Sequence, residues 1–233
     1  MATYKAPKTI SKRSELRKDA ATTAFVRVQD ALSRYRRYLT YSGIGVMALA
    51  VIIVSYIFIQ RTRTAQANEH LGGISLYYER GEYRTALDGS GENLGLIDII
   101  EQYGSTSAGN MARFYAADAT FRLGEYDQAL EWFEEYKGSG DMLEASALDG
   151  QASIFEMREQ FEEAGDLYER AAAVYENALR SPEYLKKAAR VYKKAEEYAK
   201  AEEVLLLIRE QYPDSELAGD VDFHLGFVRA RMK

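Results

Sequence analysis

The chain has 233 residues, 47% hydrophobic and 28% charged, so it can form a sizeable core but is too polar for a membrane protein with many spans. It has no Cys, and its two His are His70 and His224, which excludes disulfide scaffolds, cysteine-ligated metals and cysteine nucleophiles and leaves few ligands for a catalytic metal. The charge is uneven, because residues 1–40 carry ten Lys and Arg against three acidic residues, whereas residues 64–233 carry 18 basic and 33 acidic residues. The two ends of the chain are therefore expected to meet different surroundings.

Residues 1–37 form a basic N-terminal arm. Residues 1–12 are polar and contain Pro7, which is typical of a disordered segment. Between residues 13 and 40, apolar side chains recur at spacings of three and four, which predicts an amphipathic helix. These apolar positions are Phe25, Val28, Leu32, Tyr35 and Leu39. Such a face either lies on an anionic lipid surface or docks on a partner, whereas nucleic-acid binding is disfavoured because the basic residues are few and lack interleaved aromatics.

Residues 38–60 form an uncharged segment with Tyr38, Tyr41 and Tyr56 toward its ends. A helix of this length covers roughly 34 Å, enough for a hydrocarbon core of about 30 Å. Aromatic rings favour the headgroup level, where these tyrosines would lie. The sequence therefore predicts a single transmembrane helix and direct contact with membrane lipid.

A cleaved signal peptide is the competing interpretation, because Ala65-Gln66-Ala67 resembles the small-x-small cleavage pattern. The apolar stretch is longer than the usual core of about 7–15 residues, and the basic leader is also much longer than that of a signal peptide, so an uncleaved anchor is favoured. The positive-inside rule then places the arm in the cytoplasm and residues 61–233 outside, which in a Gram-negative cell is the periplasm. The expected location is the bacterial inner membrane.

A short motif recurs four times after this segment. Gly81-Glu82-Tyr83-Arg84-Thr85-Ala86-Leu87 is followed by Gly124-Glu125-Tyr126-Asp127-Gln128-Ala129-Leu130 and by the shorter forms Glu159-Gln160-Phe161-Glu162-Glu163-Ala164 and Glu196-Glu197-Tyr198-Ala199-Lys200-Ala201. Small residues also recur upstream, at Ala117, Ala152 and Ala189. The pattern resembles the tetratricopeptide repeat, a unit of about 34 residues in which two antiparallel helices pack through small residues. Glu159 and Glu196 depart from it by replacing the turn glycine.

The predicted fold is an all-α solenoid of tetratricopeptide-like helical hairpins, preceded by the transmembrane helix. Residues 61–107 are expected to form a degenerate first repeat with an insertion and a further helix near 94–103. Residues 108–214 form three repeats, and residues 215–233 form a C-terminal capping helix. A non-repeating helical bundle is the alternative. The run Gly89–Gly95 lacks the Gly-Lys-Ser/Thr of a phosphate-binding loop and is expected to turn the chain.

The combination of arm, span and repeats, with the segments ALDG, LGLIDIIEQYG, AGNMARFYAA and LGEYDQAL, resembles the YfgM-like family, in the version found in Bacteroidetes- and Chlorobi-type bacteria. The resemblance covers residues 40–233. It implies a periplasm-facing accessory subunit of the Sec translocon, partnered with a membrane-anchored prolyl isomerase of the PpiD kind.

First helices of tetratricopeptide repeats line a concave groove, which here would have an apolar end and a basic end. The candidate groove residues are Met111, Phe114, Phe121, Arg122, Lys186, Arg190, Lys193 and Lys194. The basic end suits an acidic or C-terminal peptide segment, and Lys186 and Arg190 partly resemble carboxylate-clamp repeats. Each end has a structural alternative. The basic residues would form a solvated helix face paired with acidic neighbours, and Phe114 and Phe121 would pack within the repeats.

The sequence thus favours a non-catalytic protein-interaction scaffold beside the export machinery, with an assembly subunit of another envelope complex as the alternative. It contains no nucleophile–base pair, metal cluster or nucleotide loop, so neither an enzyme nor a cofactor is expected.

Overall fold

The structure is a computed structural model that describes the backbone of residues 12–91 and 93–233 and the side chains of Tyr38 and of residues 40–91 and 93–233. The chain divides into two units, Met1–Ile59 and Gln60–Lys233. The segment expected to be disordered lies outside the described residues, apart from Lys12. The apolar positions expected along the arm, from Phe25 to Leu39, lie outside the described side chains.

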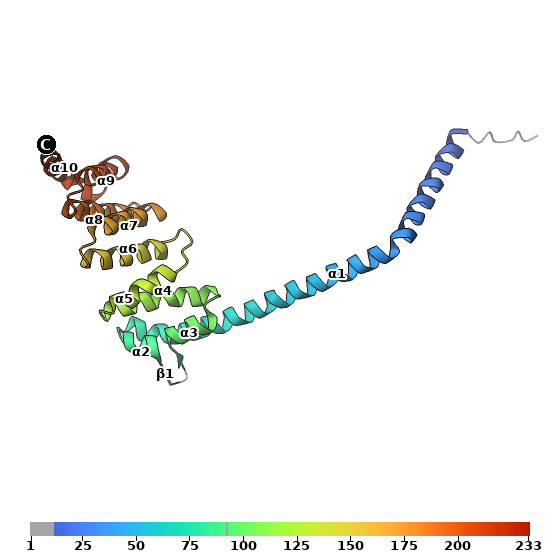
Figure 1. The fold of residues 1–233 in the computed structure, drawn as a ribbon, viewed down its shortest axis with the longest axis horizontal. Helices are drawn as coiled ribbons and strands as arrows, with labels where there is room; N and C mark the ends of the chain where they lie inside the picture. The colour runs from blue at the N-terminus through green and yellow to red at the C-terminus, as the bar shows by residue number, and fades with distance from the viewer. Residues whose placement is uncertain (1–11, 92) are drawn as a thin grey trace, which may run out of the picture. The chain divides into compact units, whose positions relative to one another are not determined.

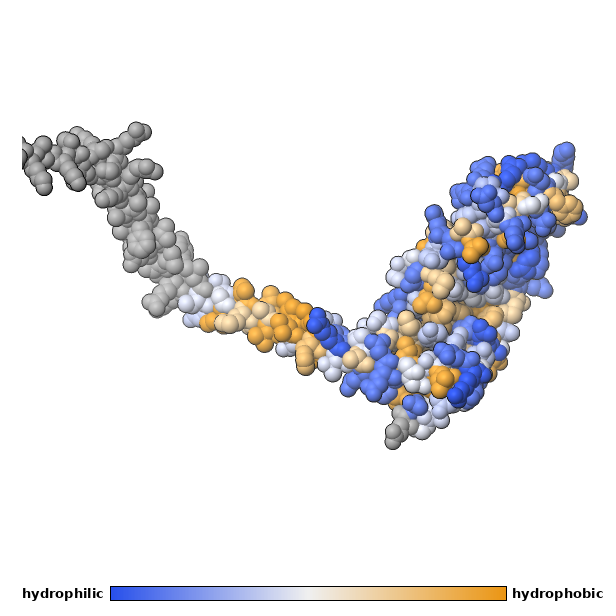
Figure 2. Space-filling model, turned by 180° about the vertical axis from the view of Figure 1, so that it is seen from behind, coloured by the Kyte–Doolittle hydropathy of each residue, from blue (hydrophilic) through white to orange (hydrophobic). Residues whose placement is uncertain are grey.

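The first helix, α1, extends from Lys12 to Glu79, so the backbone of the arm is helical as far as it is described (Figure 1). Within α1 the apolar side chains of the first unit are exposed, including Ile44 at 61% and Phe58 at 71%. Figure 2 shows them as a hydrophobic band along this helix. Among the described residues, this is the one helix long and apolar enough to cross a membrane.

The second unit consists of the end of α1 and a series of short helices in which successive members pack against each other (Figure 1). These helices are α2 (Tyr83–Asp88), α3 (Leu96–Tyr103), α4 (Ser107–Arg122), α5 (Tyr126–Glu135), α6 (Met142–Met157), α7 (Phe161–Val174), α8 (Arg180–Lys194), α9 (Tyr198–Gln211) and α10 (Val221–Arg231). The predicted all-α array of helical hairpins is confirmed.

Small side chains allow the helices of each hairpin to pack closely. The recurring alanines are completely or almost completely buried: Ala117, Ala129, Ala152, Ala164, Ala189 and Ala201. Because an alanine methyl projects so little, paired helices can approach until their larger neighbours interlock. The sequence motif therefore marks the helix crossings of the array.

The first repeat takes its first helix from the end of α1. Ala67, Leu71 and Ile74 of α1 are buried in one cluster with Ala86 and Leu87 of α2. The chain after α2 forms a two-residue ladder between β1 (Gly89–Ser90) and β2 (Asn93–Leu94), followed by α3. The insertion therefore turns the chain, as expected, and adds a helix that starts at Leu96, slightly later than predicted.

The C-terminal segment differs from the expected single helix over residues 215–233. A 3₁₀ turn, η1 (Glu216–Asp220), precedes α10, and the Ser215 hydroxyl accepts a hydrogen bond from the Leu217 amide at 3.3 Å. The side-chain cap and Gly219 favour a separate turn over a continuous α-helix. Val221 and Leu225 of α10 join the buried cluster formed by α6 to α9.

Within the described part of the chain, four helical hairpins turn through a residue with left-handed backbone conformation. Gly81 and Gly124 occupy this position in the first two, with φ of 78° and 81°, and Glu159 and Glu196 occupy it in the others, with φ of 60° and 61°. A residue with a Cβ atom is strained in this conformation. Glu159 and Glu196 therefore adopt the same left-handed turn as the two glycines, but with backbone strain that glycine would not have.

Replacing Glu159 or Glu196 by Gly is expected to raise the free energy of unfolding by about 0.5 kcal/mol each, because relief of strain exceeds the added freedom of the unfolded chain. The matched reverse change, Gly124→Ala, is expected to lower it by about 1 kcal/mol, since a Cβ there meets no atom within 4 Å and only the backbone is strained. Urea unfolding of the full chain in detergent, followed by circular dichroism, measures all three. A loss of stability on both Glu→Gly changes would contradict the assignment.

Candidate functional site

Helix α8 presents five basic side chains within nine residues: Lys186, Lys187, Arg190, Lys193 and Lys194. Three of them form ion pairs with α6. Arg190 donates to both carboxylate oxygens of Glu156 at 2.7 and 2.8 Å, Lys194 donates to Glu156 at 2.9 Å, and Lys187 pairs with Asp149. These three residues are therefore paired with acidic neighbours, which is the structural alternative to a free basic site.

Glu156 is the acidic centre of this network, and its side chain is 14% exposed. Burial opposes its ionisation, but the hydrogen bond from Lys194 and the charges of Arg190 and Lys194 outweigh burial and hold the pKa of Glu156 below its usual value. The buried Tyr168 hydroxyl also donates to Glu156, at 3.3 Å, and burial raises the pKa of Tyr168 to about 12. Glu156 is therefore a fixed anion that neutralises part of the basic face.

Lys186 and Lys193 differ from the other three basic residues. Both are half-buried, and no ion pair joins either of them to a carboxylate among the described side chains. Lys193 lies 3.5 Å from Nδ1 of His224 on α10. Burial and the charges of Lys186 and Arg190 lower the pKa of Lys193. The uncompensated positive charge of α8 thus faces α10 rather than α6.

A cavity of about 430 Å³, here the α6–α8 cavity, lies on the paired side of the basic face. Its polar lining contains Glu156 and Arg190, while Phe121 and Met157 give it an apolar wall from α4 and α6. Met157 is 48% exposed. The cavity therefore offers apolar contact beside an ion-pair network whose charges largely cancel.

A second cavity of about 460 Å³, the α8–α10 cavity, lies on the other side of the basic face. Lys186, Lys193 and His224 contribute to its polar rim together with Lys187 and Arg190, which also line the α6–α8 cavity. The two cavities therefore adjoin along α8.

The rest of the α8–α10 lining is mostly apolar. Ala189, Leu205 and Leu217 contribute aliphatic surface from α8, α9 and η1. Glu183 is the carboxylate among the lining residues, and it accepts a hydrogen bond from Arg180 at 3.1 Å. A cationic rim next to an aliphatic floor suits a ligand that carries one anionic group beside an apolar group.

Three of the predicted groove residues line neither cavity. Phe114 packs against Phe133 and Tyr136, with ring centroids 6.2 and 5.7 Å apart. Arg122 pairs with Asp118 at 2.5 Å, and Met111 is 38% exposed on α4. The structure thus brings together five of the eight predicted residues, Phe121, Lys186, Arg190, Lys193 and Lys194, around the two adjoining cavities.

The candidate site residues predicted from the sequence do not include Glu156, His224, Leu205 or Leu217. Glu156 had a detectable signal, because it stands 34 residues before Arg190, about one repeat length. Leu205 and Leu217 gave no such signal, because leucines at helical spacing are expected wherever a helix packs.

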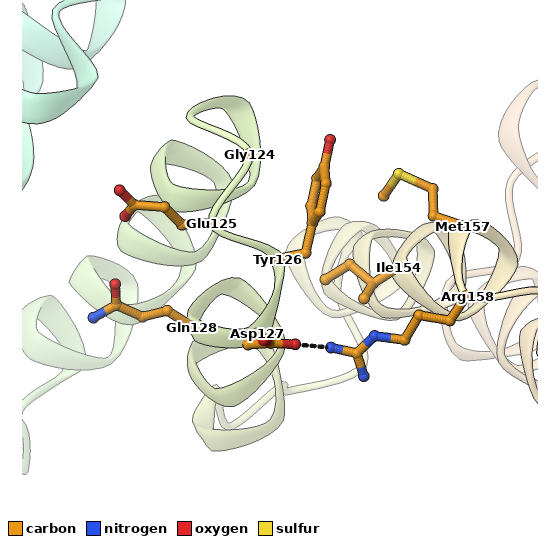
Figure 3. Close-up of a pocket in the computed structure, with 8 residues that line it drawn as sticks. All are labelled: Gly124, Glu125, Tyr126, Asp127, Gln128, Ile154, Met157 and Arg158. Atoms are coloured by element: carbon orange, nitrogen blue, oxygen red, sulfur yellow. Dashed lines mark hydrogen bonds and ion pairs between the residues drawn. The ribbon is translucent and has the colours of Figure 1, made fainter.

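A third cavity, of about 520 Å³, lies where the turn before α5 meets the end of α6. Figure 3 shows Tyr126, Ile154 and Met157 along one side of it and the Asp127–Arg158 ion pair at the other. The Asp127 side chain is 97% exposed, so water screens this pair. The cavity offers no concentrated charge and is a weaker candidate for recognition.

The arrangement has no features of a metal centre among the described side chains, where no group of three or more His, Asp and Glu is suitably placed. His224 faces Lys186 and Lys193 of α8, and Asp220 also acts on it. Burial, Lys193 and Lys186 lower its pKa, and Asp220 opposes them. The site can therefore bind and orient an anionic group by charge and hydrogen bonding.

No family model matches the sequence, and no curated protein matches it. Two crystal structures of the nearly identical TPR-like repeats of a kinesin light chain-like protein from Podosopora anserina are similar in fold, one of them a single-residue variant. In both, the likeness covers 72% of this chain and 87% of that chain, with a TM-score of 0.50 and 15% sequence identity. The chain has a tetratricopeptide-like fold. Stacked repeats of this fold present extended concave surfaces.

Proposed function

We propose that the protein is a non-catalytic scaffold, anchored in the bacterial inner membrane by the apolar part of α1, that binds other polypeptides in the periplasm. The exposed apolar segment of α1 supports the anchor, because such a surface is stabilised by lipid and not by water. The excess of basic residues before this segment supports the orientation.

The proposed division follows the sequence. Residues 1–37 are the cytoplasmic arm, residues 38–60 span the membrane, and residues 61–107 form the degenerate first repeat. Residues 108–214 form the three repeats that carry the site, and residues 215–233 close the array. In this division α1 belongs to three parts, because the helix continues from the arm through the span into the first repeat.

The observation that carries the proposal is the pair of adjoining cavities along α8, with cationic, aromatic and aliphatic lining, on a unit that is otherwise strongly acidic. Such surfaces recognise extended segments of polypeptide. The resemblance to YfgM-like proteins suggests the partners: the Sec translocon and a prolyl isomerase of the PpiD kind. The role would then be to assist newly exported chains.

Photo-crosslinking in intact membranes tests this function. A photoreactive residue in place of Met157, which lines the α6–α8 cavity, is expected to yield adducts with translocon or isomerase subunits, identified by mass spectrometry. The same residue in place of Glu131, which is exposed on α5 and lines neither cavity, serves as the control. Reversing the charge of Lys186, Arg190, Lys193 and Lys194 to Glu is expected to abolish the Met157 adducts.

A control for charge reversal uses four basic residues that lie in other ion pairs: Arg84, Lys200, Arg209 and Arg229. Their reversal is expected to leave the adducts unchanged. Adducts with subunits of a different envelope complex would favour the alternative function, and equal labelling from both positions would reject the groove as the binding surface.

A further inference from the structure

The charge on the two sides of α8 differs in a way that identifies where an anion would bind. On the α6 side, Glu156 and Asp149 neutralise Arg190, Lys194 and Lys187. On the α10 side, the described residues provide no carboxylate in an ion pair with Lys186 or Lys193. Keeping two half-buried ammonium groups of like charge close together is unfavourable, and an anion between them would relieve the repulsion.

The floor of the α8–α10 cavity restricts which anion fits. Leu217 is partly exposed and forms an aliphatic surface beside the lysines, and the almost completely buried Ala189 and Leu205 complete the floor. An internal Asp or Glu residue of a peptide could supply the carboxylate, but the same residue would supply no apolar group to contact the aliphatic floor. A phosphate group is still more hydrophilic and would also leave the floor without an apolar contact. The free α-carboxylate of a terminal residue with an aliphatic side chain provides both contacts from one residue.

The adjoining cavities also provide room for the residues that precede such a terminus. The two cavities share Lys187 and Arg190, and the α6–α8 cavity adds Phe121 and Met157 as apolar contacts. A chain end placed beside α10 can therefore continue across α8 toward α6 and α4. The neutralised side of α8 would then contact the body of the peptide, and the charged side its end.

We propose that the α8–α10 cavity binds the free C-terminal carboxylate of a polypeptide between Lys186 and Lys193, with an aliphatic last side chain against Leu205 and Leu217. This assignment rests on the proposed function as a polypeptide-binding scaffold and specifies its ligand. It gives the groove a direction, since the C-terminus lies at the α10 end.

Proton uptake accompanies this binding. His224 faces Lys186 and Lys193 of α8 and Asp220 at the end of η1, while α9 contributes the uncharged Leu205 to the same cavity. Burial and the two lysines lower the pKa of His224, and a carboxylate beside it raises that pKa again. Affinity is therefore expected to increase as the pH falls from 7.5 to 6, and His224→Gln is expected to remove this increase.

A peptide-binding measurement with the full chain in zwitterionic nanodiscs tests the assignment. The probe is a pool of eight-residue peptides labelled with fluorescein at the N-terminus, with seven randomised positions followed by Leu, as the free acid or the C-terminal amide. Fluorescence anisotropy is expected to show at least fivefold tighter binding of the acid. Lys186→Met with Lys193→Met is expected to reduce this preference to less than twofold, whereas Lys200→Met on α9, which removes one paired lysine, leaves it unchanged.

Circular dichroism of each variant establishes that it is folded, so a lost preference reports on the cavity. Equal binding of acid and amide would overturn the carboxylate assignment and leave the scaffold function standing. Displacement of the acid pool by an equal concentration of octanoate, which has a carboxylate and an alkyl chain but no peptide backbone, would assign the cavity to a fatty acid instead. Absence of Met157 crosslinks in membranes would reject the scaffold function independently.

Discussion

Replacing Gly165 by Ala is expected to lower the free energy of unfolding by roughly 2 kcal/mol, because the added methyl group overpacks the centre of the array. A Cβ atom at this position would lie 2.3 Å from Cε1 of Tyr192, far inside van der Waals contact. Tyr192 is fully buried, and its hydroxyl lies within hydrogen-bonding distance of Asp166, at 2.7 Å, and of Glu169, at 2.5 Å. The ring therefore cannot move aside without losing these hydrogen bonds.

The same substitution at Gly226 is the matched control. Gly226 also lies within a helix, α10, but a Cβ atom there meets nothing within 4 Å. Gly226→Ala is expected to raise stability by about 0.5–1 kcal/mol through helix propensity alone. Urea unfolding of the full chain in detergent, followed by the fluorescence of Trp132 and by circular dichroism, compares the two. Changes of the same sign would show that close approach at Gly165 is unimportant.

Replacing Glu156 by Gln is expected to lower the free energy of unfolding by about 1.5 kcal/mol at pH 7, because it removes charge-assisted hydrogen bonds from Arg190 and Lys194. The folded state lowers the pKa of Glu156, so its carboxylate contributes stability at pH values above the unfolded pKa. This contribution decreases as the pH falls below about 4.5, the ordinary value, because the unfolded chain then takes up a proton that the folded protein still resists. It is lost once the pH has also fallen through the lower pKa of the folded protein. The difference from wild type should therefore shrink in acid.

Asp127→Asn provides a control for loss of an ion pair with arginine. Because the Asp127 side chain is almost fully exposed, this change is expected to alter stability by less than about 0.5 kcal/mol. Urea unfolding at pH 7 and pH 4 measures both variants. A difference between wild type and Glu156→Gln that stays constant between these pH values would contradict the assigned role of the carboxylate.

Several elements could be predicted because they depend on local pattern. The motif from Gly81 to Leu87 and its three later copies located the hairpin turns, since each copy combines a turn residue, an aromatic and a small packing residue. The uncharged segment from residue 38 to residue 60 indicated a long apolar helix for the same reason. The 3₁₀ turn before α10 was missed because Leu217, Val221 and Leu225 continue at helical spacing through it, so that the single side-chain cap at Ser215 did not stand out.

The basic end of the site was visible in sequence as a cluster of lysines and arginine, but its division into a neutralised side and a free side was not. That division depends on which carboxylates of α6 reach α8. Lys187 meets Asp149 and Arg190 meets Glu156, across 38 and 34 residues of chain. The role of Phe114 could not be predicted from the sequence either. Its helical spacing is compatible both with a groove position and with the observed packing against Phe133 and Tyr136.

The sequence by itself determined the elements that short-range physics controls: the apolar helix, the repeated hairpins and the small residues at their crossings. Hydrophobic periodicity and turn preference act within a few residues, so they can be read along the chain. The tertiary structure alone decided which charges are compensated, because ion pairing depends on distances of a few ångströms between residues a repeat length apart. For the same reason it alone placed Lys186, Lys193 and His224 around one aliphatic floor.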